Sequence, residues 1–233
     1  MIVFKQKDKD IYLITNYKVM YSTLSKQGNL VRAGLSKRLY LNILLSWIFP
    51  KSKFYLIVRN PFDRIKSFYK SKFPKAEINR LWMLQNEKGE WQKCTEYFFP
   101  YLNLNTDMAP KMISQVLIST SFDKVISILP NVFSKDGHMT PQHYAKKISL
   151  SKYGYRCRIP IRFQKVFKIE SKKDLNEIEK IFDINLSKPL NSTKNIVEDF
   201  TYNDDNVKTI VNIYKRDFEE FKYEQTPSGY SII

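Results

Sequence analysis

The chain has 233 residues, of which 43% are hydrophobic, 15% aromatic and 27% charged. This composition excludes an intrinsically disordered chain and predicts one globular domain over residues 1–233. The 39 Lys and Arg residues exceed the 23 Asp and Glu residues and give a net charge of +16, which favours anionic partners of several classes.

The cysteine content and the hydropathy of the chain indicate in which cellular compartment it is expected. Cys94 and Cys157 are too few for a disulfide scaffold or a four-ligand zinc site, so we expect reduced thiols and no bound metal. Residues 1–10 lack the apolar core of a signal peptide. The most apolar stretch, residues 39–50, is shorter than the ~20 residues that span a bilayer. We therefore expect a cytoplasmic protein without a transmembrane segment.

The first half of the chain predicts two strand-turn-helix units. Residues 11–16 (IYLITN) form a short apolar run typical of a buried strand, and residues 22–35 are compatible with a helix. Residues 54–59 (FYLIVR) are typical of a strand in a parallel sheet covered on both faces. Pro61 ends this strand and opens a predicted helix over residues 61–73. This order indicates an α/β fold.

The second half of the chain adds an insertion and three further elements. Residues 74–110 contain an aromatic cluster and predict an insertion over one end of the sheet, on the acceptor side. The remaining predicted elements are a helix over 122–129, a loop over 136–144 that holds both histidines, a strand over 163–169, and helices over 172–182 and 203–221.

Basic and hydroxyl residues occur at the two turns of the strand-turn-helix units. Lys18 precedes Ser22 and Thr23, and Arg59 precedes Ser67. A helix N-terminus with a nearby cation binds an anion, so each set is suited to one phosphate. The first set is not a nucleotide-triphosphatase P-loop, because GxxxxGK[ST] is absent and residues 17–24 contain no glycine.

One long segment resembles a known motif. Residues 54–69 (FYLIVRNPFDRIKSFY) are similar to the 3′-phosphate-binding motif of carbohydrate sulfotransferases related to the Golgi chondroitin enzymes. Residues 136–142 (DGHMTPQ) resemble the D-x-H-W-x-P-Q motif of that family, with Met139 in place of tryptophan. Three more segments resemble the family in the same order: 167–170 (FKIE), 191–193 (NST) and 213–223.

The resemblance implies a P-loop-like α/β sulfotransferase fold with a central parallel β-sheet flanked by helices. It also implies 3′-phosphoadenosine 5′-phosphosulfate (PAPS) as the donor and a carbohydrate hydroxyl as the acceptor, in a soluble enzyme of bacterial type. The residues that it assigns to the donor are Lys18, Ser22 and Thr23 for the 5′-phosphosulfate, Arg59 and Ser67 for the 3′-phosphate, and Ser192 and Thr193 over the nucleotide.

Sulfuryl transfer also needs a base and positive charge near the leaving phosphate. Lys18 is suited to stabilise the group in transfer, because an ammonium follows charge as it develops. His138 is our candidate base, since a neutral imidazole accepts a proton near neutral pH. The alternatives are four carboxylates: Glu77, Glu87, Glu90 and Glu170.

A cluster of arginines follows the histidine loop. Arg156, Arg158 and Arg162 are interpreted either as contacts for a carbohydrate acceptor that carries anionic groups or as a solvated face. Two other functions compete with sulfuryl transfer. A nucleic-acid-binding protein would use the charge and the aromatics, but no RRM, KH or zinc pattern is present, so we expect no nucleic-acid partner. A P-loop-type kinase would need the absent Walker lysine.

Overall fold

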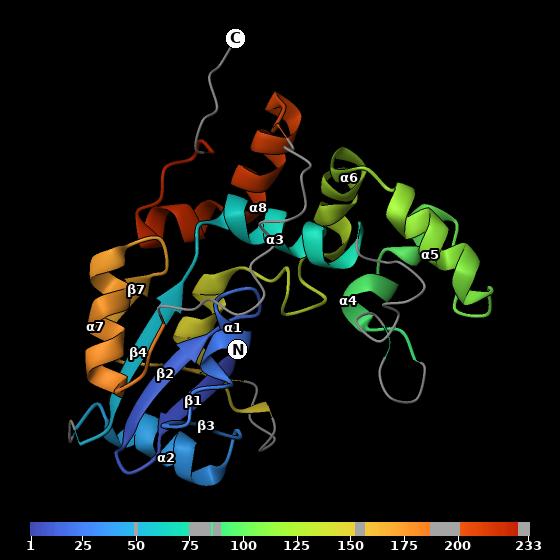
Figure 1. Ribbon diagram of the computed structural model, residues 1–233. Coiled ribbons are helices and arrows are strands. Elements are labelled where there is room, and N and C mark those ends of the chain that lie inside the picture. The colour runs from blue at the N-terminus through green and yellow to red at the C-terminus, as the bar shows by residue number, and fades with distance from the viewer. Residues whose placement is uncertain (49–50, 75–84, 86–89, 152–156, 187–200, 228–233) are drawn as a thin grey trace. The chain divides into compact units, whose positions relative to one another are not determined.

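The structure is a computed structural model that describes residues 1–48, 51–74, 85, 90–151, 157–186 and 201–227 (Figure 1). The chain forms two compact units, each built from two segments. We call Met1–Asn60 with Gln142–Ser192 the sheet unit, and Pro61–Pro141 with Thr193–Ile233 the helical unit.

The sheet unit contains a five-stranded mixed sheet in the order β3-β1-β2-β4-β7. Its strands are β1 (Ile2–Gln6), β2 (Ile11–Thr15), β3 (Leu30–Arg32), β4 (Lys53–Val58) and β7 (Phe163–Lys168). β2, β4 and β7 are parallel, as predicted. β1 is antiparallel to β2 and β3, so an entirely parallel sheet is wrong. A four-residue polar turn between β1 and β2 allows this antiparallel pairing, whereas parallel strands need a longer crossover.

Both faces of the sheet are covered, which explains the continuous apolar run of β4. On one face, Tyr55 and Phe167 pack with Phe182 of α7 (Lys172–Phe182). On the other face, Tyr12 stacks on Phe54 with ring centroids 4.9 Å apart. α2 (Lys37–Leu45) lies on this second face, where Asn42 Nδ2 donates a 2.8 Å hydrogen bond to the Tyr12 hydroxyl.

The predicted helix over residues 22–35 is wrong. α1 spans only Tyr21–Leu24, and the chain then turns into β3. Residues 25–29 are all polar or glycine, so this segment has no apolar face that could hold a helix against the sheet. A hydrogen bond of 3.1 Å from Leu30 N to Gln27 O closes the turn instead. The sheet unit also contains η3 (Gln142–Lys146) and the hairpin formed by β5 (Lys147–Ser149) and β6 (Arg158–Pro160).

The helical unit surrounds a separate apolar core. Its helices are α3 (Pro61–Lys72), α4 (Lys93–Glu96), η2 (Phe99–Leu102), α5 (Pro110–Ser119), α6 (Phe122–Val132) and α8 (Asp204–Phe221). Phe68 of α3, Leu129 of α6 and Phe218 of α8 meet in this core. Trp91, Phe98 and Phe99 are buried in the same core, so the described part of the predicted insertion packs among these helices.

Local signals account for the helix ends that the sequence predicts correctly. Pro61 opens α3. The Ser121 side chain accepts a 3.2 Å hydrogen bond from Lys124 N at the start of α6, and the Asn203 side chain accepts one of 2.8 Å from Asn206 N at the start of α8. The predicted helices over 61–73, 122–129, 172–182 and 203–221 are therefore confirmed.

Among the residues that the structure describes, no single helix has the length and apolarity to cross a membrane. The adjoining helices α5 and α6 meet that test only as a pair, bent by 107°.

Candidate functional site

Three parallel strands end at the same edge of the sheet. β2 leads into residues 16–20, β4 leads into Arg59 and Asn60, and β7 leads into Ile169 and Glu170. Because β4 lies between β2 and β7, these three segments meet at one carboxyl edge, where ligands bind in open α/β sheets. We call residues 16–20, 59–60 and 169–170 the carboxyl edge.

The segment after β2 is a strained turn. Lys18 and Met20 both have positive φ values, 66° and 56°, which cost a residue with a side chain roughly 1–2 kcal/mol each. The hydroxyl of the buried Thr15 donates a 3.0 Å hydrogen bond to Val19 O and so holds the turn. The half-buried Lys18 is thereby fixed directly beyond the end of β2.

Arg59 is fixed by a buried glutamine. Gln142 Oε1 accepts a 2.9 Å hydrogen bond from Arg59 N, and Gln142 Nε2 donates one of 2.7 Å to Arg59 O. Gln142 has no exposed surface. The Arg59 side chain turns toward the first segment, where Nη1 donates to Lys18 O at 3.2 Å. The two basic residues of the predicted phosphate sites therefore meet at the carboxyl edge.

Glu170 has a structural contact at this edge. Its Oε1 accepts a 2.7 Å hydrogen bond from Asn60 N, immediately before α3 begins. This hydrogen bond gives Glu170 a structural role at the carboxyl edge. Among the other carboxylates considered as bases, Glu90 is exposed, and Glu77 and Glu87 lie outside the described residues.

The hydroxyl residues after Lys18 differ in accessibility. Ser22 is half-buried on α1, whereas Thr23 is only 3% exposed. Because α1 has four residues, its dipole is small, and any phosphate contact here depends on side chains and backbone amides of the turn. Ser22 is the better placed of the two for a ligand.

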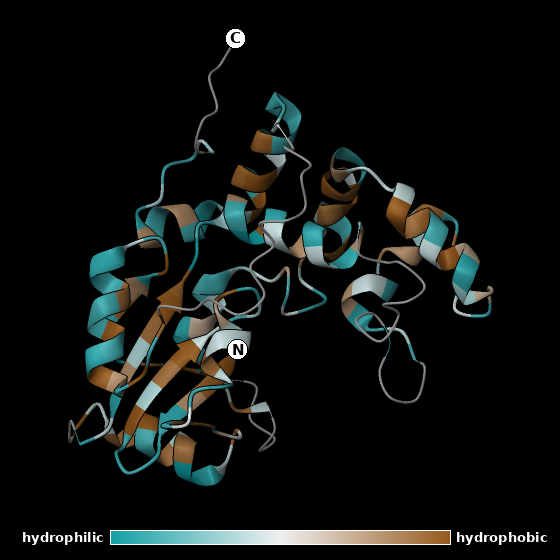
Figure 2. Cartoon of the chain, viewed as in Figure 1, coloured by the Kyte–Doolittle hydropathy of each residue, from teal (hydrophilic) through white to brown (hydrophobic). Residues whose placement is uncertain are grey.

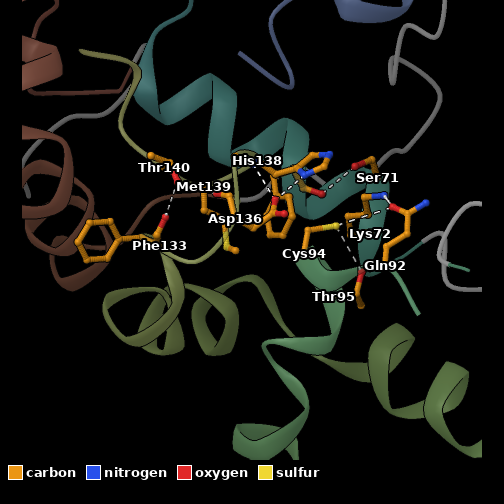
Figure 3. A network of polar contacts seen from close by, with 12 residues as sticks. Ser71, Lys72, Gln92, Cys94, Thr95, Phe133, Asp136, His138, Met139 and Thr140 are labelled. Atoms are coloured by element: carbon orange, nitrogen blue, oxygen red, sulfur yellow. Dashed lines mark hydrogen bonds and ion pairs between the residues drawn. The ribbon is translucent and has the colours of Figure 1, made fainter. Parts of the chain in front are cut away.

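The candidate base lies in the helical unit. His138 Nδ1 is 2.6 Å from Asp136 Oδ1, and the same oxygen accepts a 2.8 Å hydrogen bond from His138 N (Figure 3). Burial raises the pKa of Asp136, but the hydrogen bonds and charge of His138, together with the nearby Lys72 charge, outweigh burial and lower it. An ionised Asp136 can only accept, so Nδ1 of His138 is the donor in this contact.

Two buried side chains hold the backbone on either side of His138. Arg64, 1% exposed on α3, donates from Nη2 to Gly137 O at 3.0 Å. The hydroxyl of Tyr214 on α8 donates to Met139 O at 2.5 Å. Burial raises the pKa of Tyr214, with Arg64 opposing and Asp217 adding to this change, so the hydroxyl remains a donor. We call residues 136–140 the His138 loop.

Cys94 also lies near the His138 loop (Figure 3). One potential ligand atom each of Cys94, Asp136 and His138 falls within 4.8 Å of the others. However, Lys72 Nζ donates to Gln92 Oε1 at 2.6 Å beside Cys94, and its positive charge acts on Asp136. A cation whose charge acts on Asp136 opposes a divalent metal there, so the geometry fits a hydrogen-bonded acid-base pair better.

The remaining predicted residues are distributed over both units. Ser67 is half-buried on α3 in the helical unit. Arg158 and Arg162 are exposed in the sheet unit, where the Arg158 guanidinium lies 5.6 Å from the centre of the Tyr144 ring. Arg156, Ser192 and Thr193 lie outside the described residues.

Sequence reasoning missed the side chains that position the site. In the sequence, Gln142 is the last residue of the motif over 136–142, and Arg64 and Tyr214 lie in predicted helices without a functional assignment. Each acts on a backbone group of a distant segment, 83 residues away for Gln142 and 73 or 75 for the other two. A single sequence contains no local signal for such contacts.

Comparison of the chain with protein-family models, curated proteins and solved structures gives no match.

Proposed function

We propose that the chain is a PAPS-dependent sulfotransferase that transfers a sulfuryl group to a hydroxyl of a carbohydrate. The observation that carries this proposal is the meeting of Arg59 with the Lys18 turn at the carboxyl edge, where the Arg59 side chain contacts Lys18 O at 3.2 Å. Two cations at one ligand-binding edge suit a nucleotide that carries two separate anionic groups, as PAPS does.

The roles at this edge follow from the chemistry of each side chain. Arg59 presents a planar, permanently charged fork that matches a phosphate, so we assign it to the 3′-phosphate. Lys18 presents a mobile point charge, which we assign to the 5′-phosphosulfate, with Ser22 and Thr23 as further contacts. The sequence resemblance adds Ser67, Ser192 and Thr193 to the nucleotide contacts.

In the proposed reaction, the acceptor oxygen attacks sulfur as the bond between sulfur and the 5′-phosphate oxygen breaks. The acceptor proton passes to His138 Nε2, and the leaving group is adenosine 3′,5′-bisphosphate. Lys18 stabilises the negative charge that develops on the leaving oxygen. Asp136, hydrogen-bonded to Nδ1 at 2.6 Å, stabilises the imidazolium that His138 becomes.

The sequence resemblance implies a carbohydrate acceptor, and exposed positive charge suits one that carries anionic groups. Arg158 and Arg162 are exposed on the sheet unit and offer two cations to an acceptor that carries anionic groups. Arg156 lies two residues before Arg158 in the sequence and is assigned the same role. A screen with sulfate-labelled PAPS against neutral glycans, anionic glycans and a tyrosine peptide tests this assignment. Labelling of the peptide alone would contradict a carbohydrate acceptor.

Ligand-induced stabilisation tests the donor. A ligand that binds only the folded protein at 100 times its Kd stabilises it by about 2.7 kcal/mol, which a melting curve detects. We expect adenosine 3′,5′-bisphosphate to raise the Tm, and ATP with magnesium or a mixed oligonucleotide to have a smaller effect. A shift with the oligonucleotide alone would favour nucleic-acid binding, and a shift with ATP and magnesium alone would favour a kinase.

A further inference from the structure

α2 of the sheet unit has two apolar faces. Leu39, Tyr40 and Ile43 are buried in the sheet unit, with exposed fractions of 5% or less. Leu41, Leu44 and Leu45 occupy the opposite face and are 39–53% exposed. An ordinary surface helix carries polar residues on its outer face, so the apolar outer face of α2 indicates an interaction surface.

The exposed apolar surface extends beyond the end of α2. Ile48 is 71% exposed and follows Leu41, Leu44 and Leu45 at helical spacing, and Trp47 is 50% exposed. We call Leu41, Leu44, Leu45, Trp47 and Ile48 the α2 patch. Five of the eleven large hydrophobic side chains that are exposed in the described part of the chain belong to it. Figure 2 shows hydrophobic residues along α2.

Two contacts fix the α2 patch to the hairpin of the sheet unit. The Tyr40 hydroxyl donates to Ser149 O at 2.9 Å, and Trp47 Nε1 donates to Pro160 O at 3.1 Å. The indole nitrogen is therefore satisfied while half of the side chain remains exposed. These hydrogen bonds fix the position of the patch within the sheet unit.

Basic residues predominate around the α2 patch, although Asp10 Oδ1 lies 4.0 Å from Arg38 Nη2. Residues 11–62 contain no Asp or Glu, and their eight Lys and Arg residues are Lys18, Lys26, Arg32, Lys37, Arg38, Lys51, Lys53 and Arg59. Lys37 and Arg38 are exposed in the first turn of α2, and Lys51 and Lys53 are exposed shortly after the patch. Arg158 and Arg162 are exposed on and beside β6 of the fixed hairpin.

We propose that the α2 patch docks the protein on the surface of an anionic lipid bilayer. Exposed leucines and a tryptophan beside lysines and arginines are the features of a helix that lies in a membrane interface. A nine-residue helix is about 14 Å long, too short to cross the ~30 Å hydrocarbon core, so α2 would lie along the surface. Each basic residue near an anionic leaflet adds attraction, which salt screens.

Charge also decides between a bilayer and a second copy of the chain. Two copies that meet through the α2 patch would bring together two basic surfaces of proteins that each carry +16. That contact is repulsive, whereas the contact with an anionic bilayer is attractive. The proposal does not depend on sulfuryl transfer, and its test uses no enzymatic activity.

Vesicle co-sedimentation of the full chain tests the proposal. We expect binding to vesicles of phosphatidylcholine mixed with phosphatidylglycerol, weak binding to pure phosphatidylcholine, and a decrease as salt rises. Leu44→Ser with Ile48→Ser should weaken binding at least ~tenfold. The matched control is Met112→Ser with Ile118→Ser, two side chains 53% and 42% exposed on α5 of the helical unit, which should leave binding unchanged.

Charge variants and fluorescence complete the test. Lys37→Gln with Arg38→Gln should weaken binding to the anionic vesicles, and Lys208→Gln with Lys215→Gln, exposed on α8, should not.

Vesicles should shift the fluorescence of Trp47 to the blue, and Trp47→Phe should remove that shift. Equal binding to both vesicle types, or none, would overturn the proposal. Self-association lost in the serine variant, without vesicle binding, would assign the patch to a second copy.

Discussion

Gln142 binds Arg59 through both polar groups of the Arg59 backbone. The glutamine amide accepts from Arg59 N at 2.9 Å and donates to Arg59 O at 2.7 Å, so it extends the end of β4 as a neighbouring strand would. This pairing fixes the residue that the proposed function assigns to the 3′-phosphate. Gln142 belongs to the segment 136–142 that resembles the D-x-H-W-x-P-Q motif, and its role in this structure is to position the Arg59 backbone.

Replacement of Gln142 by leucine should destabilise the protein. Leucine has a similar volume but removes both hydrogen bonds that the fully buried Gln142 makes to the Arg59 backbone, which costs about 2–4 kcal/mol in the free energy of unfolding. Urea denaturation measures this loss. Gln164→Leu, on an exposed position of β7, is the matched control and should change stability by less than ~0.5 kcal/mol. Equal effects of the two substitutions would contradict the role of Gln142.

Substitutions of Lys18 and Arg59 should separate donor binding from transfer. Arg59→Ala should abolish the rise in Tm with adenosine 3′,5′-bisphosphate, because the fixed cation assigned to the 3′-phosphate is lost. Lys18→Ala should keep that rise and reduce transfer by roughly 10²–10³-fold, the effect of removing one charge-stabilising group.

Lys18→Gly controls for the strained backbone. Glycine removes the same ammonium but favours the positive φ of 66°, which alanine does not. Equal loss of transfer in the alanine and glycine variants would assign the effect to charge. Recovery of transfer in the glycine variant would contradict the proposed role of the Lys18 ammonium.

The lowered pKa of Asp136 predicts a pH-dependent contribution to stability. Folding favours the ionised carboxylate, so its contribution is present above the unfolded value near 3.8 and is lost as pH falls through the lower folded value. Asp136→Asn should therefore reduce the free energy of unfolding by about 1–2 kcal/mol at pH near 7. Urea denaturation at acidic pH, below 3.8, should show a smaller difference between the two proteins. A difference that grows toward acidic pH would contradict this sign.

The sequence predicts the fold well where local pattern and packing agree. The strand over residues 54–59 and the helix over 61–73 match β4 and α3 because a long apolar run, a proline and helical spacing act in succession. The helix over 22–35 fails because its apolar residues have no consistent spacing beyond Leu24. β1 is missed because five residues give little pattern, and its pairing with β2 and β3 supplies the rest.

The site is predictable only in part for the same physical reason. Charged residues at strand ends, such as Lys18 and Arg59, can be found because the strands themselves are visible in the sequence. Their mutual contact through Lys18 O depends on the pairing of β2 with β4, which no local pattern encodes. Arg64 falls within the predicted helix over residues 61–73, and only the packed core shows that it binds Gly137 O.

Replacement of His138 by alanine should lower turnover strongly and leave the Tm rise with adenosine 3′,5′-bisphosphate unchanged. Loss of a general base typically reduces the rate by ~10²–10⁴-fold. His143→Ala is the matched control, since His143 lies on η3 and contacts the Tyr144 ring. Wild-type turnover in His138→Ala would transfer the role of base to a carboxylate, with Glu90 and Glu170 tested next.

Tyr214 should act on turnover only through the His138 loop. Tyr214→Phe keeps the buried ring and removes the hydroxyl that donates to Met139 O, next to His138, so we expect a loss of about 1–2 kcal/mol in stability and a moderate loss of turnover. A double-mutant cycle separates this role from a direct one. If Tyr214 positions His138, adding Tyr214→Phe to His138→Ala should lower turnover no further, although it should still lower stability. An undiminished loss of turnover in the double variant would show that Tyr214 acts independently of His138.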